Sequence, residues 1–548
     1  MNKINRYILF LLLPVLYFLS SYILKSAQGP YYLNFYDPGY VYLISSLNIA
    51  QGFGVGHFDH PGTTVQMIGS LVMRIYFSLT GKNPDIAVDV LSRPEDYMYV
   101  LNTAFIFINA SVLFILGVLA LKFTKNIYLS LLLQLSPFTS MEIFYGSIIV
   151  SPDNFLITVS LLFLCALIYY WFSVNIDESG NDPPSLKLTL VFAIICGLGL
   201  ATKLNFIPLV FIPFFLIRGY KNKMYFWIFT VISFLIFITP ILFDISQFAL
   251  WVENLAMKSG KYGKGDADVV NTNLLLPNLK MIFSKDAVFT FSYIMLILTF
   301  IISVYGYLKE KSSGVKYFTE MKKINKIMLS LLFAVTLQIL LVAKHYAQYY
   351  LIPSMMLSVF ILVICIYILL PEFEKVYKKI KPEYCFAVVF IFISIWTSVR
   401  IFESYNEAVI FKNEALGSVK FLNENYKDDM LIPAFSSANR ECALAFSVRY
   451  AAGKKKDYEK IISEINRSQI FYDPWDNRFY KSSDPDNLKN DLLSLRDKKE
   501  KLILQMYYGS PENFIMKLNE ACNVNNSTFK EVFSNENGER IYEITIGK

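Results

Sequence analysis

The sequence predicts a polytopic α-helical membrane protein of about 11 transmembrane helices, followed by a C-terminal extracytoplasmic α/β domain. Of the 548 residues, 55% are hydrophobic and only 17% are charged, and the mean hydropathy is +0.42. This composition excludes disordered, collagenous and disulfide-scaffold proteins, and it disfavours a purely soluble multidomain enzyme. The prediction rests on this composition, on the lengths of the apolar runs and on the contrast between residues 1–402 and the remainder.

Apolar runs near the roughly 20 residues that cross a bilayer follow one another as far as Phe402. The first run comes after Lys3 and Arg6 and lacks a small-residue cleavage site, so we expect a retained span and not a removed signal peptide. The expected spans are residues 7–24, 97–121, 127–146, 154–173, 188–202, 205–217, 224–243, 286–308, 327–343, 347–370 and 384–402.

Residues 64–80 are apolar enough to suggest one more span, but Arg74 would then lie near the membrane midplane. Such a position costs at least about 2.5 kcal/mol. A helix in the membrane interface, with Arg74 among the headgroups, avoids this cost. We therefore expect an interfacial helix within a long first external loop, residues 25–96.

The basic residues set the expected orientation. With the N-terminus in the cytoplasm, the cytoplasmic segments hold 18 Lys and Arg in 62 positions, as the positive-inside rule requires. An odd number of spans then places residues 403–548 outside. These residues carry 21 basic and 23 acidic side chains, so the basic excess belongs to the membrane part and needs no nucleic acid to explain it.

Two external loops contain recognisable signals. Asp37-Pro38 reads as the cap and first residue of a helix that continues to Ala50 and stops at Gly52. The loop 244–285 contains a Gly- and Lys-rich stretch, residues 257–273, for which a mobile lid and an unstructured connector are equally good interpretations.

The tail alternates expected helices at 405–425, 437–450, 486–498 and 510–521 with short strands at 429–433, 469–472 and 501–505, and ends in a hairpin around Gly538. This order predicts a small α/β domain with a partly parallel sheet. Cys442 and Cys522 could form a disulfide if the tail is outside the cytoplasm, and the sequence leaves this open.

The candidate site comprises the ionisable residues at the outer ends of the expected spans, namely Asp37, Asp59, His60, Asp153, Lys203, Lys344 and His345. Paired carboxylates such as Asp37 and Asp153 can activate a hydroxyl. Each also has a simpler explanation, because an acid beside proline at a helix start is an ordinary cap. Asp59 likewise stabilises a turn as readily as it binds a ligand.

The basic residues have alternatives too. Lysines at span ends usually extend to the interface, but Lys203 and Lys344 lie on the side that the positive-inside rule disfavours, which suggests a bound anion such as a lipid phosphate. The three histidines, His57, His60 and His345, could bind a metal, yet nothing fixes their geometry. We therefore expect no cofactor.

Several short motifs, in this order, resemble those of the C-type (GT-C) integral-membrane glycosyltransferases, especially the protein O-mannosyltransferase and lipid A aminoarabinose transferase branch. The motifs are Asp37-Pro38-x-Tyr40, His60-Pro61-Gly62, Ser151-Pro152-Asp153, Gly-Leu-Ala-Thr-Lys203 and Lys344-His345-Tyr346, with Tyr349-Tyr350 following. The resemblance covers about residues 5–400. Gly62 departs from that branch, which often has a second proline there.

The resemblance implies an enzyme of a bacterial-type cell (inner) membrane that inverts a sugar during transfer from a polyprenyl-phosphate donor to a hydroxyl of a protein, lipid or glycan. Asp37 would be the catalytic base and Asp153 would orient a substrate. The residues implied to bind substrate or lipid phosphate are Asp59, His60, Lys203, Lys344, His345, Tyr40 and Tyr346. No metal is implied.

Two other classes of function remain open from the sequence. A transporter or flippase of a lipid-linked or polar solute would carry ionisable residues and broken helices near the midplane. The expected spans are nearly free of such residues. A surface polysaccharide polymerase or ligase would share a lipid-linked donor but use a diphosphate-linked oligosaccharide.

Overall fold

The computed structural model describes residues 7–34, 36–173, 186–258, 265, 272–310, 317–376, 381–453, 457–466, 468, 470–481, 488–498 and 501–547. The chain divides into two compact units. We call residues 1–22, 58–65 and 103–402 the helical unit, and residues 23–57, 66–102 and 403–548 the mixed unit. Most of the predicted lid, residues 257–273, lies outside the described residues.

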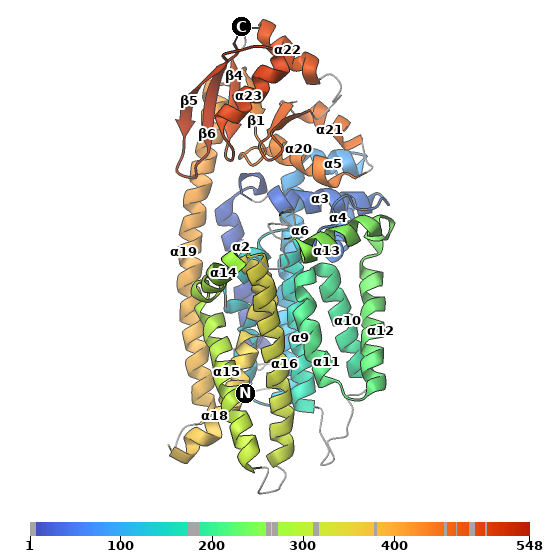
Figure 1. Ribbon diagram of the computed structural model, residues 1–548, viewed down its shortest axis with the longest axis vertical. Helices are drawn as coiled ribbons and strands as arrows, with labels where there is room; N and C mark the ends of the chain where they lie inside the picture. Colours follow the sequence, from blue (N-terminus) through green and yellow to red (C-terminus); the bar gives the residue numbers. More distant parts are fainter. Residues whose placement is uncertain are drawn as a thin grey trace. The chain divides into compact units, whose positions relative to one another are not determined.

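The helical unit is built from packed helices. Figure 1 shows α9, α10, α11 and α12 running side by side, and α16 packs on both α11 and α15. The elements are α7 (Ile127–Gln134), η2 (Ser136–Phe138), α8 (Met141–Ser147), α9 (Pro152–Ser173), α10 (Leu186–Thr202), η3 (Leu204–Phe206), α11 (Ile207–Leu216), α12 (Tyr220–Phe237), η4 (Thr239–Asp244), α13 (Ile245–Met257), α14 (Thr272–Lys285), α15 (Ala287–Glu310), α16 (Tyr317–Lys344), η6 (Gln348–Leu351), α17 (Ile352–Met355) and α18 (Ser358–Val376). Four helices have residues in both units: α2 (Leu12–Gln28), α4 (Thr63–Thr80), α6 (Pro94–Thr124) and α19 (Pro382–Asn425).

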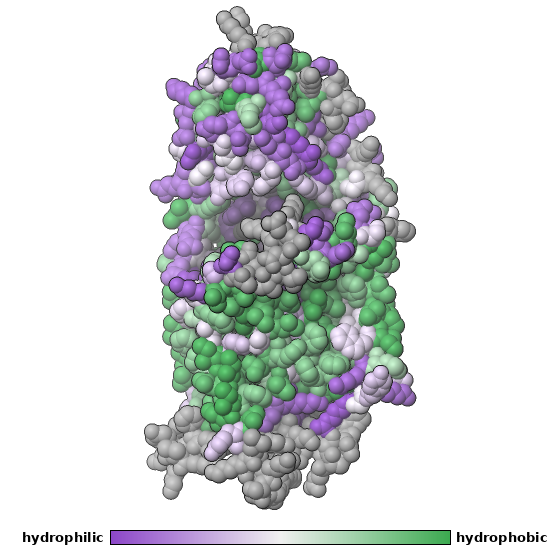
Figure 2. Space-filling view, in the orientation of Figure 1, coloured by the Kyte–Doolittle hydropathy of each residue, from purple (hydrophilic) through white to green (hydrophobic). Residues whose placement is uncertain are grey.

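Long apolar helices make the chain compatible with a polytopic helical membrane protein. Within the described residues, six helices are long and apolar enough to cross a membrane, and η6–α17 with α18 form a pair, bent by 44°, that makes up to seven. Figure 2 shows hydrophobic residues over most of the visible face of the helical unit. Leu298 and Ile395, for example, are 50% and 61% exposed, which suits contact with lipid.

In the described part of the chain, four of the eleven expected spans, 127–146, 188–202, 205–217 and 224–243, contain none of these candidate crossings. Residues 127–146 are not one helix but α7 and α8, separated by the turn η2, because Pro137 has no N–H to continue the helical ladder. The apolar helices α10 and α11 have 17 and 10 residues. Hydrophobicity alone could not reveal these breaks.

The mixed unit contains a four-stranded sheet of order β1-β4-β6-β5 and a separate β2-β3 hairpin. β1 and β4 are parallel and the other neighbours are antiparallel. The strands are β1 (Met430–Pro433), β2 (Ile470–Asp473), β3 (Arg478–Lys481), β4 (Leu502–Met506), β5 (Thr528–Ser534) and β6 (Arg540–Thr545), and the helices are α20 (Arg440–Ala451), α21 (Asp457–Ile465), α22 (Leu488–Lys498) and α23 (Pro511–Cys522). The sequence analysis did not predict α21 or β3. Cys442 and Cys522 are separate, buried free thiols.

Helices of the first loop belong to this same unit, whereas the sequence assigned them to the transmembrane domain. These are α3 (Tyr36–Ala50), most of α4, and α5 (Ile86–Ser92), with the short turn η1 (Tyr31–Leu33) before them. The Asn48 amide donates a 2.9 Å hydrogen bond to the carbonyl of Ala451, and Gln51 donates one of 2.5 Å to the Tyr458 hydroxyl. α3 therefore packs on α20 within the mixed unit.

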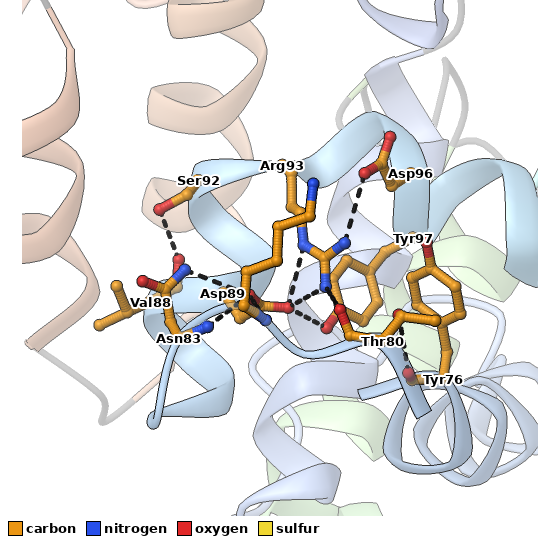
Figure 3. A network of polar contacts seen from close by, with 10 residues as sticks. Tyr76, Thr80, Asn83, Val88, Asp89, Ser92, Arg93, Asp96 and Tyr97 are labelled. Carbon is orange, nitrogen blue, oxygen red and sulfur yellow. Dashed lines mark hydrogen bonds and ion pairs between the residues drawn. The ribbon is translucent and has the colours of Figure 1, made fainter. Parts of the chain in front are cut away.

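A buried carboxylate organises the segment between α4 and α6. Asp89 is fully buried and accepts hydrogen bonds from Arg93, from Tyr97 at 2.5 Å, and from the backbone N–H groups of Lys82 and Asn83. Figure 3 shows the guanidinium of Arg93 and the hydroxyl of Tyr97 directed at this carboxylate. Because every donor lies within residues 82–97, the network fixes the fold of this segment.

Candidate functional site

A buried ion pair lies at the centre of the candidate site in the helical unit. The ammonium of Lys203 donates hydrogen bonds of 2.7 and 2.8 Å to the two carboxylate oxygens of Asp153. Lys203 is 2% exposed and Asp153 is 9% exposed. The structure thus joins two of the residues that the sequence singled out, 50 positions apart.

Local structure explains how the two side chains meet. Asp153 lies in the first turn of α9, directly after Pro152, where the positive end of the helix dipole favours an acid. Lys203 follows the last residue of α10 and has an extended backbone, with φ −159° and ψ 131°. Ending the helix at this point frees the Lys203 side chain to reach Asp153.

The His60 turn holds Lys203 in this extended conformation. Pro61 and Lys203 form an antiparallel β-bridge. The N–H of Gly62 donates to the carbonyl of Thr202 at 3.2 Å, and the N–H of Leu204 donates to the carbonyl of His60 at 3.0 Å. The His60-Pro61-Gly62 motif is therefore hydrogen-bonded through its backbone to Lys203 and its two neighbours. Asp59, which is half-buried, belongs to the same turn.

Aromatic rings surround the ion pair. The ring centroids of Tyr349 and Tyr350 lie 4.7 and 4.6 Å from the Lys203 ammonium, within the range of a cation–π contact. The carbonyl of Tyr350 accepts hydrogen bonds from Asn205 and Gln338, which fix this turn. The imidazole of His60 lies beside Tyr350, with ring centroids 6.2 Å apart.

This arrangement excludes water while keeping a carboxylate and a cation together. A lysine ammonium has three donors, and two of them face Asp153. Each carboxylate oxygen has further lone pairs that the single lysine does not occupy. Tyr349 is 36% exposed and is the part of the enclosure nearest to solvent. The pair can therefore hold a polar ligand in a site of low dielectric constant, where its charges act strongly.

The remaining basic candidates make other contacts. Lys344 donates to the carbonyls of Leu255 and Ala256, and a ring nitrogen of His345 lies 3.1 Å from the Leu255 carbonyl. These carbonyls belong to the last turn of α13, which a cation stabilises. The Tyr346 hydroxyl donates to the side chain of Gln348 at 2.9 Å. A phosphate-binding role for these residues stays a prediction.

Asp37 and Tyr40 belong to the mixed unit. Asp37 is exposed, has non-helical φ and ψ, and precedes Pro38 at the start of α3. Tyr40 is fully buried, and its hydroxyl donates a 2.6 Å hydrogen bond to Glu95. Burial and the nearby Glu95 carboxylate raise the pKa of Tyr40 well above its ordinary value. This hydroxyl therefore supports the fold of α3.

Sequence reasoning missed a cavity in the helical unit with a volume of about 460 Å³. Its charged lining residues are Glu142, Lys285, Asp286 and Arg400, with Gln348, Trp396 and Thr397 among the other lining residues. Asp286 is buried and accepts a 3.0 Å hydrogen bond from the N–H of Phe289, so it caps α15. The helix breaks before α8 and α15 bring Glu142, Lys285 and Asp286 to the cavity, and α19 contributes Arg400. Pro137 is the sequence feature that indicates the break before α8.

Among the residues that the structure describes, no group of three or more His, Cys, Asp or Glu side chains is arranged to hold a metal ion. No protein family model, no curated protein and no solved structure matches the chain. The functional argument therefore depends on the residues and their geometry.

Proposed function

We propose that this protein is an inverting glycosyltransferase that moves a sugar from a polyprenyl-phosphate donor to a hydroxyl acceptor at the outer face of a membrane. One observation carries the proposal. The predicted motifs around His60, Asp153 and Lys203 are far apart in the sequence, yet their residues form one buried, aromatic-lined cluster. A structural ion pair alone does not require the surrounding aromatic rings or a histidine beside them.

In this proposal each residue has a defined chemical task. Asp37 accepts the proton of the acceptor hydroxyl as its oxygen attacks the anomeric carbon. The bond from that carbon to the donor phosphate breaks on the opposite face, which inverts the configuration. Lys203 and His60 stabilise the departing polyprenyl phosphate, and Asp153 holds Lys203 and orients the donor. The phosphate enters on the Tyr349 side of the ion pair.

The proposal includes a membrane topology. The chain has eleven crossings, with the N-terminus in the cytoplasm and residues 403–548 outside, and α7 with α8 form a broken crossing. Single cysteines introduced at the exposed positions Lys420 and Lys530 should react with an impermeant maleimide in intact cells, in a background where the six native cysteines are replaced. Labelling only after lysis would overturn the topology.

The donor can be identified without assuming its sugar. Mass spectrometry of lipids that copurify with the protein should find a polyprenyl phosphate, with or without an attached monosaccharide. With that donor, Asp37→Asn should abolish transfer and leave the melting temperature unchanged. Asp96→Asn is a matched control, because Asp96 is an exposed acid in the same loop region. An active Asp37→Asn enzyme would exclude Asp37 as the base.

A second candidate function is a transporter or flippase. The observation that favours it is the broken helices, namely the η2 break and the 44° bend between α17 and α18, since transporters build binding sites at such points. Counterflow of a lipid-linked sugar in liposomes, without covalent product, would favour this function over transfer.

A further inference from the structure

Three exposed aromatic side chains gather on one edge of the mixed unit. Tyr450, Trp475 and Tyr508 are 40%, 50% and 55% exposed. They come from α20, from the turn between β2 and β3, and from the loop after β4. We call these three residues the aromatic platform. A contiguous group of exposed aromatic side chains is a mark of a binding surface.

The rings are held in a fixed arrangement. The ring planes of Trp475 and Tyr508 lie within 22° of parallel, with centroids 5.9 Å apart. Phe446 is buried beneath the platform, with its centroid 6.0 Å from Trp475 and 4.6 Å from Tyr450. The platform therefore rests on the core of the unit and has little freedom to collapse.

The two loops that carry Trp475 and Tyr508 are each fixed. The buried carboxylate of Asp473 accepts hydrogen bonds from the N–H groups of Trp475 and Asp476, at 3.0 and 3.2 Å. Gly509 has φ +103°, and a Cβ there would lie 2.9 Å from the Cβ of Pro474, so the loops pack closely. Such preorganisation reduces the entropy lost when a ligand binds.

The platform lies beyond the ends of two strands. Tyr508 follows the carboxyl end of β4, which is parallel to β1 in the four-stranded sheet. Trp475 follows β2 of the separate hairpin, which one parallel bridge, Ala434 to Tyr472, joins to the end of β1. The close approach of Gly509 to Pro474 places the two loops side by side.

Ion-paired charges lie beside the platform. Asp476 is 47% exposed and accepts hydrogen bonds from Arg449 at 3.0 Å and from Arg478 at 2.7 Å. With Asp473 paired to Arg449, two acids meet two arginines. The exposed side chains of Asp476 and Arg478 offer acceptors and donors to hydroxyl groups.

We propose that the aromatic platform binds a neutral glycan. The C–H face of a sugar ring packs on the exposed face of Trp475 or of Tyr508, and the sugar hydroxyls bond to Asp476 and Arg478. This binding site is independent of donor chemistry in the helical unit. It brings an oligosaccharide to the protein whether that oligosaccharide is modified there or only bound.

The test uses the full-length protein in nanodiscs, without donor lipid, on an array of neutral oligosaccharides of glucose, mannose, galactose, rhamnose and N-acetylglucosamine. At least one class should bind, and Trp475→Ala or Tyr508→Ala should weaken that binding at least about tenfold. Trp475→Phe should retain most of it. Phe529→Ala is the control, since Phe529 is an exposed aromatic on β5, outside the platform.

Three outcomes would overturn the proposal. The first is that no oligosaccharide binds the native protein more strongly than it binds the Trp475→Ala/Tyr508→Ala double variant. The second is equal binding by the platform variants and the Phe529→Ala control. The third is platform-dependent adsorption to phosphatidylglycerol vesicles in place of glycan binding. Far-ultraviolet circular dichroism and melting curves check that each variant is folded. Trp475→Phe tests the platform while keeping an aromatic ring at position 475.

Discussion

Two buried carboxylates paired with a cation, Asp89 in the mixed unit and Asp153 in the helical unit, differ in how they are satisfied. Asp89 of the mixed unit accepts from Arg93, Tyr97, Lys82 and Asn83, all close in sequence. Among the described residues of the helical unit, the Asp153 carboxylate accepts its hydrogen bonds from Lys203, 50 positions away.

The difference separates a structural carboxylate from one suited to a site. The donors to Asp89 occupy most of its lone pairs, so little remains for a ligand. Asp153 keeps unused lone pairs and lies among aromatic rings beside His60. A pair assembled from distant segments also depends on the correct fold of the whole helical unit. The following predictions test this contrast, from the largest expected effect to the smallest.

Lys203→Met should have the largest effect. It leaves the buried Asp153 carboxylate without a cation, which costs about 3–5 kcal/mol. The melting temperature in detergent should fall, and the copurified polyprenyl phosphate should be lost. The double variant Asp153→Leu/Lys203→Met should recover much of the stability but not the lipid. A single variant that melts like the native protein would mean that the pair is not buried.

Asp89→Asn should destabilise the mixed unit by about 2–3 kcal/mol, because Arg93 loses its charged acceptor. Hydrogen exchange of residues 82–97 should become faster, while polyprenyl phosphate retention should stay unchanged. The control is Asp96→Asn, whose carboxylate is 49% exposed and 3.5 Å from Arg93. It should change stability by less than about 0.5 kcal/mol. Loss of the lipid in Asp89→Asn would remove the distinction between the pairs.

Acid should weaken the mixed unit through Asp89. Burial raises the pKa of this carboxyl, but the hydrogen bonds from Arg93 and Tyr97 and from Lys82 and Asn83 outweigh burial and hold the pKa well below its usual range. A lowered pKa contributes its full stabilisation above the unfolded value of about 4. This contribution declines as the pH falls below that value and is gone only below the pKa of the folded state. Proteolysis of residues 82–97 between pH 6 and 3 should rise more in the native protein than in Asp89→Asn. Equal slopes would contradict the assignment.

Tyr349→Leu should have the smallest effect. Its ring is partly exposed, so loss of the cation–π contact with Lys203 should cost about 0.5–1 kcal/mol. Tyr349→Phe keeps the ring and should melt like the native protein. A large loss in both variants would show that the Tyr349 hydroxyl, and not the ring, supports the site.

The sequence predicted the elements of the tail well because strands and caps are local patterns. β1, β4 and α23 lie within one or two residues of the expected ranges. Residues 64–80 lie in one helix, α4, as expected, with Arg74 bonded to the carbonyl of Ala50. The span 127–146 was wrong as a single helix, since hydropathy does not register the break at Pro137.

The candidate site could be predicted only in part. Asp153, Lys203 and His60 were identified because ionisable residues at span ends are rare. Their mutual contact was not predictable, and neither was the cavity lined by Glu142 and Asp286, because both depend on how distant helices pack. Lys344 and His345 met the same sequence criterion, yet they contact the end of α13.

The sequence by itself determined the apolar character of the first 402 residues, the alternation of helices and strands in the tail and the rarity of charge in the spans. These properties follow from the hydrophobicity and propensity of neighbouring residues. Only the tertiary structure decided that Lys203 faces Asp153, that the first loop packs with the tail, and that Trp475 and Tyr508 form one surface. Such contacts join residues far apart in the chain, and their energies depend on burial that no local pattern encodes.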